Sequence, residues 1–143
     1  MFVKGFSVQE TLVGSFDHGD DLLLSLKQLC KERDISAGRI EVIGSVEEAK
    51  IKYFYKKRKM FDGVFYRKSM EIVSCIGTIT THEGEPFIHC HISLADHEGV
   101  LYGGHLAEGT RLYSSEFNIA VYEYSGKTLE RHHDAESNLL LLK

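Results

Sequence analysis

Three histidines in the middle of the chain have a spacing that could bind a metal. Apolar and polar residues alternate from Phe87 to Ala95, which predicts a strand with one buried face. His89 and His91 are two residues apart, so their side chains leave the same face of this strand. Cys90, between them, is expected to face the core.

A tight turn and a second strand bring the third histidine into line. The segment from Asp96 to Gly99 has the composition of a three-residue hairpin loop closed by a glycine bulge. A register shifted by one residue would place His105 among apolar side chains, so we reject it. We therefore expect His91 opposite His105, with His89 on the diagonal and three imidazoles converging. The full set of expected pairs is Asp96 with Val100, Leu94 with Tyr102, Ser93 with Gly103, His91 with His105, and Cys90 with Leu106.

Three imidazoles on two rigid strands are typical of an open zinc site. Zinc accepts histidine nitrogens readily, and three protein ligands leave a fourth position for water or a ligand. The alternative is a solvated strand face that happens to be rich in histidine. No residue stands out as a fourth ligand, and we expect His82 and His97 to be solvated instead of coordinating.

The clearest helix precedes this region and supplies the scaffold. Asp20 is the expected N-cap, and Asp21 then lies near the positive end of the helix dipole. The helix carries nothing that looks catalytic, and its apolar stripe is expected to cover a sheet. The stripe consists of Leu22, Leu23, Leu26, Leu29 and Cys30.

Most of the remaining chain is β-prone, so the expected fold class is α/β (α+β). We predict a single domain over residues 1–143, with a mostly antiparallel β-sheet curled around or packed on one main amphipathic helix. A short apolar strand is expected at 139–142, and a polar surface segment at 129–134.

Composition excludes several classes of protein. No apolar run approaches the ~18–20 residues that cross a membrane, and the N-terminus has no secretory signal pattern. Three cysteines without a CxxC pair favour reduced thiols in a cytoplasm. The net charge of −4 gives no global attraction to nucleic acid.

A local basic segment, Lys50–Lys59, is the exception to this acidic balance. It contains six cations interleaved with aromatic residues, a pattern that could contact phosphates and stack on bases. The alternative, which we favour, is a solvent-exposed strand face that runs into an exposed charged loop and has no binding role.

A general base would be needed for catalysis, and Glu71 is the first candidate. It lies in a β-prone run, 70–81, where Val73 and Cys75 are expected to share its face. Glu71 could orient a ligand or act as a base, although a salt bridge at the strand end is the commoner role of such a residue. Arg67 and Tyr102 are further candidates.

The histidine hairpin also resembles a known family. The matching residues are 84–96 (GEPFIHCHISLAD), Gly99 and 103–106 (GGHL), with support from 43–46, 70–74 and 77–79. This pattern resembles the plant and prokaryote conserved (PPC) domain, in particular its stand-alone archaeal and bacterial members, and extends over essentially the whole chain.

The resemblance implies a single α/β domain that is commonly a homotrimer. Plant relatives join this domain to an AT-hook for A/T-rich DNA, but the chain has no Arg-Gly-Arg-Pro hook. The fold is also similar to that of acetolactate decarboxylase, which holds its metal with histidines. This analogy suggests an alternative, a zinc-dependent enzyme of the decarboxylase or lyase type acting on a small carboxylate.

Three functions follow, in order of preference. The first is a small homotrimeric module that binds zinc through His89, His91 and His105. The second is a regulatory or DNA-associated protein that uses the Lys50–Lys59 segment, and the third is the zinc-dependent enzyme with Glu71 as its candidate base.

Overall fold

The computed structural model describes residues 1–123 and 129–142, which form one helix and nine strands. The α+β class predicted from the sequence is confirmed, because a mostly antiparallel sheet packs on the single described helix. In chain order the elements are β1 (Val8–Gly14), α1 (Leu22–Glu32), β2 (Gly38–Tyr55), β3 (Met60–Tyr66), β4 (Met70–His82), β5 (Glu85–Ala95), β6 (Leu101–Leu106), β7 (Arg111–Tyr122), β8 (Arg131–Asp134) and β9 (Leu139–Leu142).

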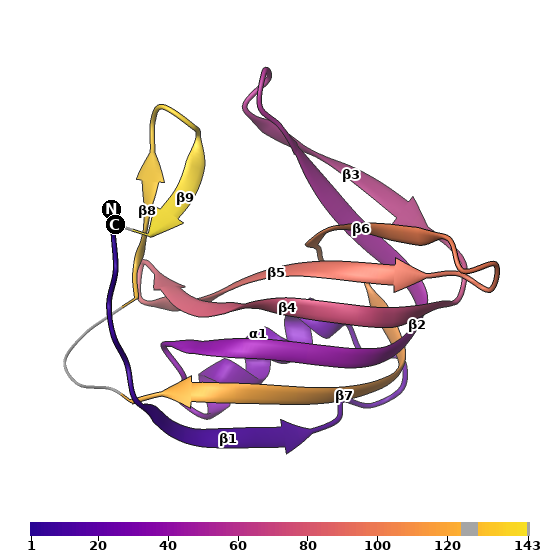
Figure 1. Cartoon of the computed structure of the whole chain (residues 1–143), viewed down its shortest axis with the longest axis horizontal. Coiled ribbons are helices and arrows are strands. Elements are labelled where there is room, and N and C mark those ends of the chain that lie inside the picture. Colours follow the sequence, from indigo (N-terminus) through magenta and orange to yellow (C-terminus); the bar gives the residue numbers. More distant parts are fainter. Residues whose placement is uncertain (124–128, 143) are drawn as a thin grey trace.

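The main sheet has the strand order β1-β7-β2-β4-β5-β6 (Figure 1). Strand β3 lies outside this order and pairs with β2. The long strand β2 holds the sheet together. The first part of β2 pairs with β4 and β7, and its last part pairs with β3 and β6. Contact between β2 and β6 curls the sheet onto itself, so the histidine-bearing strands lie at the closing seam.

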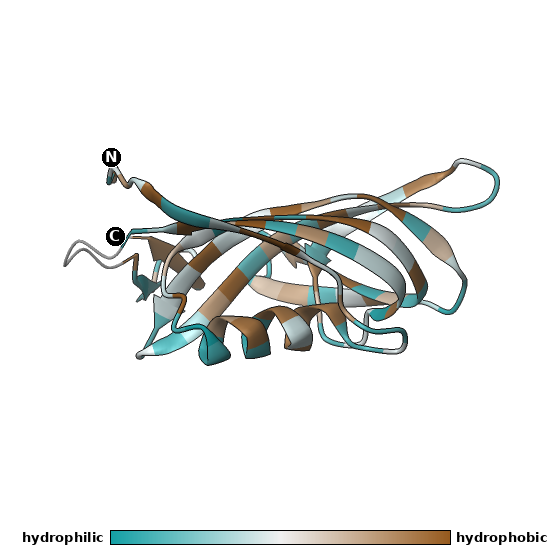
Figure 2. Cartoon of the chain, turned by 90° about the horizontal axis from the view of Figure 1, so that it is seen from below, coloured by the Kyte–Doolittle hydropathy of each residue, from teal (hydrophilic) through white to brown (hydrophobic). Residues whose placement is uncertain are grey.

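Helix α1 covers one face of this sheet with its leucine stripe (Figure 2). The expected N-cap was wrong by one residue. Asp21 has an extended backbone, and its side chain accepts the N–H of Leu24 at 3.0 Å. Its second oxygen accepts the N–H of Gly109 at 2.6 Å. Asp20 is instead held in the preceding turn, where its N–H donates to the Asp17 carbonyl.

The predicted histidine hairpin is confirmed for the pairs that matter to the site. His91 pairs with His105, and the pairs of Ser93 and Leu94 with their expected partners also form. The expected pair of Cys90 with Leu106 was wrong, because β6 leaves β5 after His105 and Leu106 pairs with Ile51 of β2.

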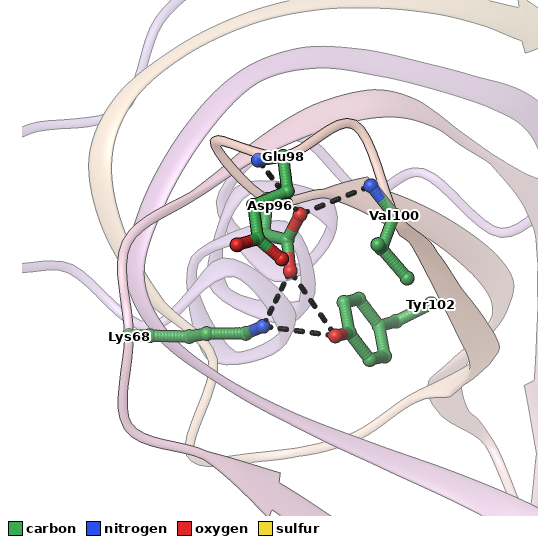
Figure 3. A network of polar contacts seen from close by, with 5 residues as sticks. All are labelled: Lys68, Asp96, Glu98, Val100 and Tyr102. Atoms are coloured by element: carbon green, nitrogen blue, oxygen red, sulfur yellow. Dashed lines mark hydrogen bonds and ion pairs between the residues drawn. The ribbon is translucent and has the colours of Figure 1, made fainter.

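A buried carboxylate fixes the turn of this hairpin (Figure 3). The Asp96 side chain is 4% exposed, and one oxygen accepts the N–H groups of Glu98 and Val100 at 3.1 and 3.0 Å. The other oxygen accepts the Lys68 ammonium at 2.7 Å and the Tyr102 hydroxyl at 3.1 Å. The network joins the turn to the β3–β4 connection and so locks the register that sets His91 against His105.

Replacing Asp96 with asparagine is expected to lower the melting temperature by roughly 3–6 °C at pH 7. The Lys68 ammonium, which bonds to the Asp96 carboxylate, is the main reason that the Asp96 pKa is held well below its usual range. The ionised Asp96 carboxylate therefore stabilises the folded protein above pH ~4, and this stabilisation is lost as the pH falls further. Thermal melts from pH 7 to pH 2 should show the two proteins converging in acid.

The matched control for this substitution is Glu98→Gln, since Glu98 joins the network through its backbone N–H. An Asp96→Asn protein as stable as the wild type at pH 7 would contradict the role assigned to the carboxylate.

Strand β4 departs from the simple alternation expected of it. A register shift between Ile72 and Ser74 inserts an extra residue, so Ile72 and Cys75 both face the core and Val73 is 52% exposed. Val73 lies on the exposed face with Glu71 as expected, but the expectation that Cys75 shares this face was wrong, because the bulge reverses the pattern for the rest of the strand.

Two hairpins project from the sheet, β2–β3 and β8–β9 (Figure 1). Their tips meet where the Asn138 amide donates to the Lys59 carbonyl at 3.0 Å. The apolar strand expected at 139–142 is confirmed as β9. The expectation of a polar surface segment at 129–134 was wrong in its first half, because Leu129 and Arg131 are buried.

Candidate metal centre

The three histidines converge as their spacing predicted. His89 and His91 leave one face of β5, and His105 lies across from His91 on β6. The ring centroids are 4.2 Å apart for His91–His105, 5.2 Å for His89–His105 and 5.4 Å for His89–His91. One nitrogen from each ring lies within 4.8 Å of the other two.

This arrangement fits a zinc ion in its donor type and its spacing. A tetrahedral site with Zn–N bonds near 2.0–2.1 Å needs nitrogens about 3.4 Å apart, so modest side-chain rotations would close the cluster on an ion. Among the described residues, no fourth histidine, cysteine or carboxylate joins the group. A metal bound here would therefore keep a position open for an outside ligand.

Burial lowers the pKa of two of the three rings, those of His89 and His105. It is the main cause that lowers the pKa of His89 to about 4, with Arg131, His105 and His91 acting in the same direction. Burial and the neighbouring His91 also lower the pKa of His105, against a hydrogen bond to the backbone of Lys52. Neutral imidazole is the form that coordinates metals, so the lowered pKa values of His89 and His105 favour coordination by these two rings.

A cavity of about 800 Å³ opens beside His89 and His105. The β2–β3 and β8–β9 hairpins line it together with β5, β6 and α1. Phe61 of β3 packs edge-on against the His105 ring, with centroids 5.0 Å apart. Lys52 pairs with His105 across the β2–β6 seam and lines the same cavity.

Arg131 is the residue at this site that the sequence did not reveal. It begins β8, and its Nη2 donates to Nδ1 of His89 over 3.3 Å. Its Nε donates to the Thr80 hydroxyl at 3.0 Å, and its Nη1 to the Leu140 carbonyl at 2.9 Å. The only sequence signal was an arginine in a short segment before an apolar strand, which does not show what lies beneath it.

The candidate catalytic residues lie away from the histidines. Glu71 is exposed at the start of β4, where it pairs with Ala95, whereas His91 pairs with Ile76, five residues further along. At about 3.3 Å per residue this separation is roughly 15 Å. The Arg67 guanidinium instead lies over the ring of Phe65, at 5.2 Å from its centroid.

The other residues singled out from the sequence do not belong to the cluster of three histidines. Tyr102 belongs to the Asp96 network, and His97 is exposed in the hairpin turn as expected. His82 is half-buried, against expectation, because its Nδ1 bonds to the Arg131 backbone carbonyl at 2.9 Å and ties β8 to the end of β4. The cations of Lys50–Lys59 are spread from the cavity wall to the tip of the β2–β3 hairpin.

Comparison with known proteins gives a match to one family model. Residues 3–125 match the model of the Plants and Prokaryotes Conserved (PCC) domain. The chain belongs to this family. None of the curated protein sequences matches the chain. Several solved structures are similar to it.

A metal-containing protein from Archaeoglobus fulgidus superposes on the PPC chain with a TM-score of 0.93 and 29% identity, covering 100% of this chain and 99% of that one. A plant- and prokaryote-conserved protein from Pyrococcus horikoshii gives 0.92 and 31%, with 100% and 97% covered. A protein from Ralstonia eutropha, named as a candidate DNA-binding protein, gives 0.82 and 31%, with 92% and 89% covered.

A Staphylococcus aureus protein of unknown function, described as similar to alpha-acetolactate decarboxylase, has a TM-score of 0.55 at 15% identity. Its likeness to the PPC chain concerns the fold alone. For the part of the chain that the structure describes, no helix is long and apolar enough to span a membrane.

Proposed function

We propose that this PPC protein is a homotrimeric metal-binding module that holds zinc through His89, His91 and His105. The observation that carries the proposal is the cluster of three imidazole nitrogens within 4.8 Å of one another on two paired strands. The Archaeoglobus relative, a metal-containing protein, supports it. The open coordination position and the adjoining cavity suit the recognition of a small ligand.

Metal analysis tests this proposal directly. Protein purified without a nickel column should carry about one zinc ion per chain, measured by plasma mass spectrometry. An anomalous-scattering map at the zinc edge should place the ion among the three rings. Protein without stoichiometric metal that also fails to take up added zinc would refute the proposal.

The trimer is supported by the sheet face opposite α1. Ile43 and Ile76 are each more than half exposed on this face, as is Val73 at the bulge. Exposed apolar residues in neighbouring strands favour burial in an interface. Light scattering on the eluted protein should give three times the chain mass of 16.2 kDa, and Ile43→Asp should shift the protein toward the monomer. A wild-type monomer at micromolar concentration would contradict this assembly.

DNA association is the second candidate, and the projecting β2–β3 hairpin is the observation that favours it (Figure 1). Its tip presents Lys56, Lys57, Arg58 and Lys59. The Ralstonia relative, named as a candidate DNA-binding protein, points the same way.

A duplex titrated over a series of salt concentrations should show affinity that falls steeply with salt if this tip binds phosphates. Replacing the four tip cations with glutamine should flatten the slope of log K against log salt by about one unit for each phosphate that is no longer bound. Glutamine at Lys31 and Arg33, near the end of α1, is the matched control. Equal slopes for the wild type and the tip variant would remove DNA from the proposed roles.

A further inference from the structure

Arg131 carries a buried charge that no carboxylate of the described chain neutralises. It is 7% exposed, and burial lowers its pKa. Its four hydrogen-bond partners are all uncharged groups, and none of the ion pairs among the described residues includes it. Buried charges are normally paired, because an unpaired one loses its hydration without compensation. The four hydrogen-bond partners are the Thr78 and Thr80 hydroxyls, the Leu140 carbonyl and His89 Nδ1. A partner from outside the chain would supply the missing negative charge.

The guanidinium is held firmly at one end and loosely at the other. Nε to Thr80 and Nη1 to Leu140 are short bonds, at 3.0 and 2.9 Å. Nη2 makes only long contacts, 3.4 Å to Thr78 and 3.3 Å to His89. Contacts of this length are weak, so Nη2 can change partners while the rest of the group stays in place.

The contact with His89 excludes metal binding by the same ring. A guanidinium only donates hydrogen bonds, so His89 Nδ1 accepts from Nη2 with its lone pair. A neutral imidazole has one lone-pair nitrogen, and its other nitrogen carries a proton. If that lone pair is given to a metal, neither nitrogen can still accept a bond from Arg131. A metal ion and Arg131 therefore compete for His89.

We propose that Arg131 is the carboxylate-binding residue of the metal site. Without metal, Nη2 caps the lone pair of His89. When a metal takes that lone pair, Nη2 is released and binds the carboxylate of a small ligand that occupies the cavity beside the metal. This inference rests on the proposed metal site, and it makes metal binding and carboxylate binding mutually reinforcing.

The surroundings of Arg131 favour a carboxylate with an apolar body. The Nη1–Nη2 edge of a guanidinium offers two parallel N–H groups that match the two oxygens of a carboxylate. Lys50 and Lys52 add positive charge to the cavity wall, which also carries three glutamates. Two of these are paired with lysines, Glu108 with Lys27 and Glu85 with Lys31. The Phe87 ring lies 5.2 Å from the guanidinium carbon, and Leu139 to Leu141 complete an apolar side.

The test measures metal affinity, by competition with a chromophoric chelator, in the presence and absence of acetate. In the wild type, saturating acetate should strengthen metal binding about tenfold, within the usual range of coupling between two sites. Sulfate at the same ionic strength should have a clearly smaller effect. A sulfate effect equal to that of acetate would overturn the assignment to carboxylates.

Arg131→Met separates the two roles of the side chain. Because the competing donor is gone, this variant should bind metal at least as tightly as the wild type without acetate. Its acetate effect should fall below about twofold. Arg39→Met, an exposed arginine that pairs with Glu41, is the control and should keep the full acetate effect.

A measurement on the wild type covers the case in which Arg131→Met fails to fold. Nitrogen-15 spectra of the histidine rings should show the His89 Nδ1 signal moving when zinc alone is added. The Arg131 side-chain signals should then move on addition of acetate to the zinc-loaded protein. Failure to bind zinc would refute the metal site itself. Normal zinc binding with no response to acetate would refute only the role of Arg131.

Discussion

Replacing His105 with alanine is expected to reduce bound zinc from about one ion per chain to less than a tenth of that. His105 is the only one of the three proposed ligands that β6 supplies, and the two left on β5 cannot enclose an ion by themselves. Its ring is also the closest neighbour of His91 within the cluster, with centroids 4.2 Å apart. Zinc stoichiometry after dialysis, with circular dichroism to confirm folding, measures the effect.

The control for this variant is His97→Ala. His97 lies in the turn of the same hairpin but is exposed and outside the cluster. The His97→Ala substitution should leave the zinc content unchanged. A His105→Ala protein that is folded and still binds one zinc ion as tightly as the wild type would show that the ion, if present, lies elsewhere.

The second large effect is expected from Gly77→Ala in β4. A Cβ atom at this position would lie 2.2 Å from the His89 carbonyl oxygen and 2.3 Å from the Cys90 sulfur. The nearest of these atoms is backbone, so β4 and β5 must separate locally. We expect a loss of about 2 kcal/mol or more in stability, as for other overpacked positions, and a melting temperature lower by roughly 6 °C.

The same substitution should weaken zinc binding, because the displaced strand carries His89 and His91. Gly63→Ala in β3 is the matched control, since a Cβ there meets nothing closer than 3.8 Å. Thermal melts and chelator competition on both variants distinguish strain from a general effect of removing a glycine. A Gly77→Ala protein with wild-type stability would show that the two strands tolerate separation.

The histidine hairpin was predictable because every part of its signal is local. A period of two between Phe87 and Ala95 assigned the faces, and the turn ending at Gly99 set the register. His91 and His105 are joined by this one turn, so no distant contact was needed to bring them together. The helix was predictable for the same reason, although its first residue depended on which aspartate the loop from Gly109 contacts.

The rest of the site depends on contacts that no local pattern encodes. Arg131 reaches His89 only because β8 folds back over the end of β4, held by Thr81 and His82. The bulge after Ile72 leaves no sequence signature, yet it changes which β4 side chains are exposed. Glu71 was a candidate because it is a carboxylate in a β-prone run, but its distance along β4 separates it from the histidines.

The position of β2 among four partner strands has a consequence for how the chain folds. Its first half pairs with β7, across about half the length of the chain, and Ile51 and Lys52 in its second half pair with β6. These pairings cannot form until the intervening segments have been brought together, so their loop-closure entropy must be met first. Refolding should therefore be slow for a protein of this size, in the millisecond-to-second range typical of topologies dominated by distant contacts.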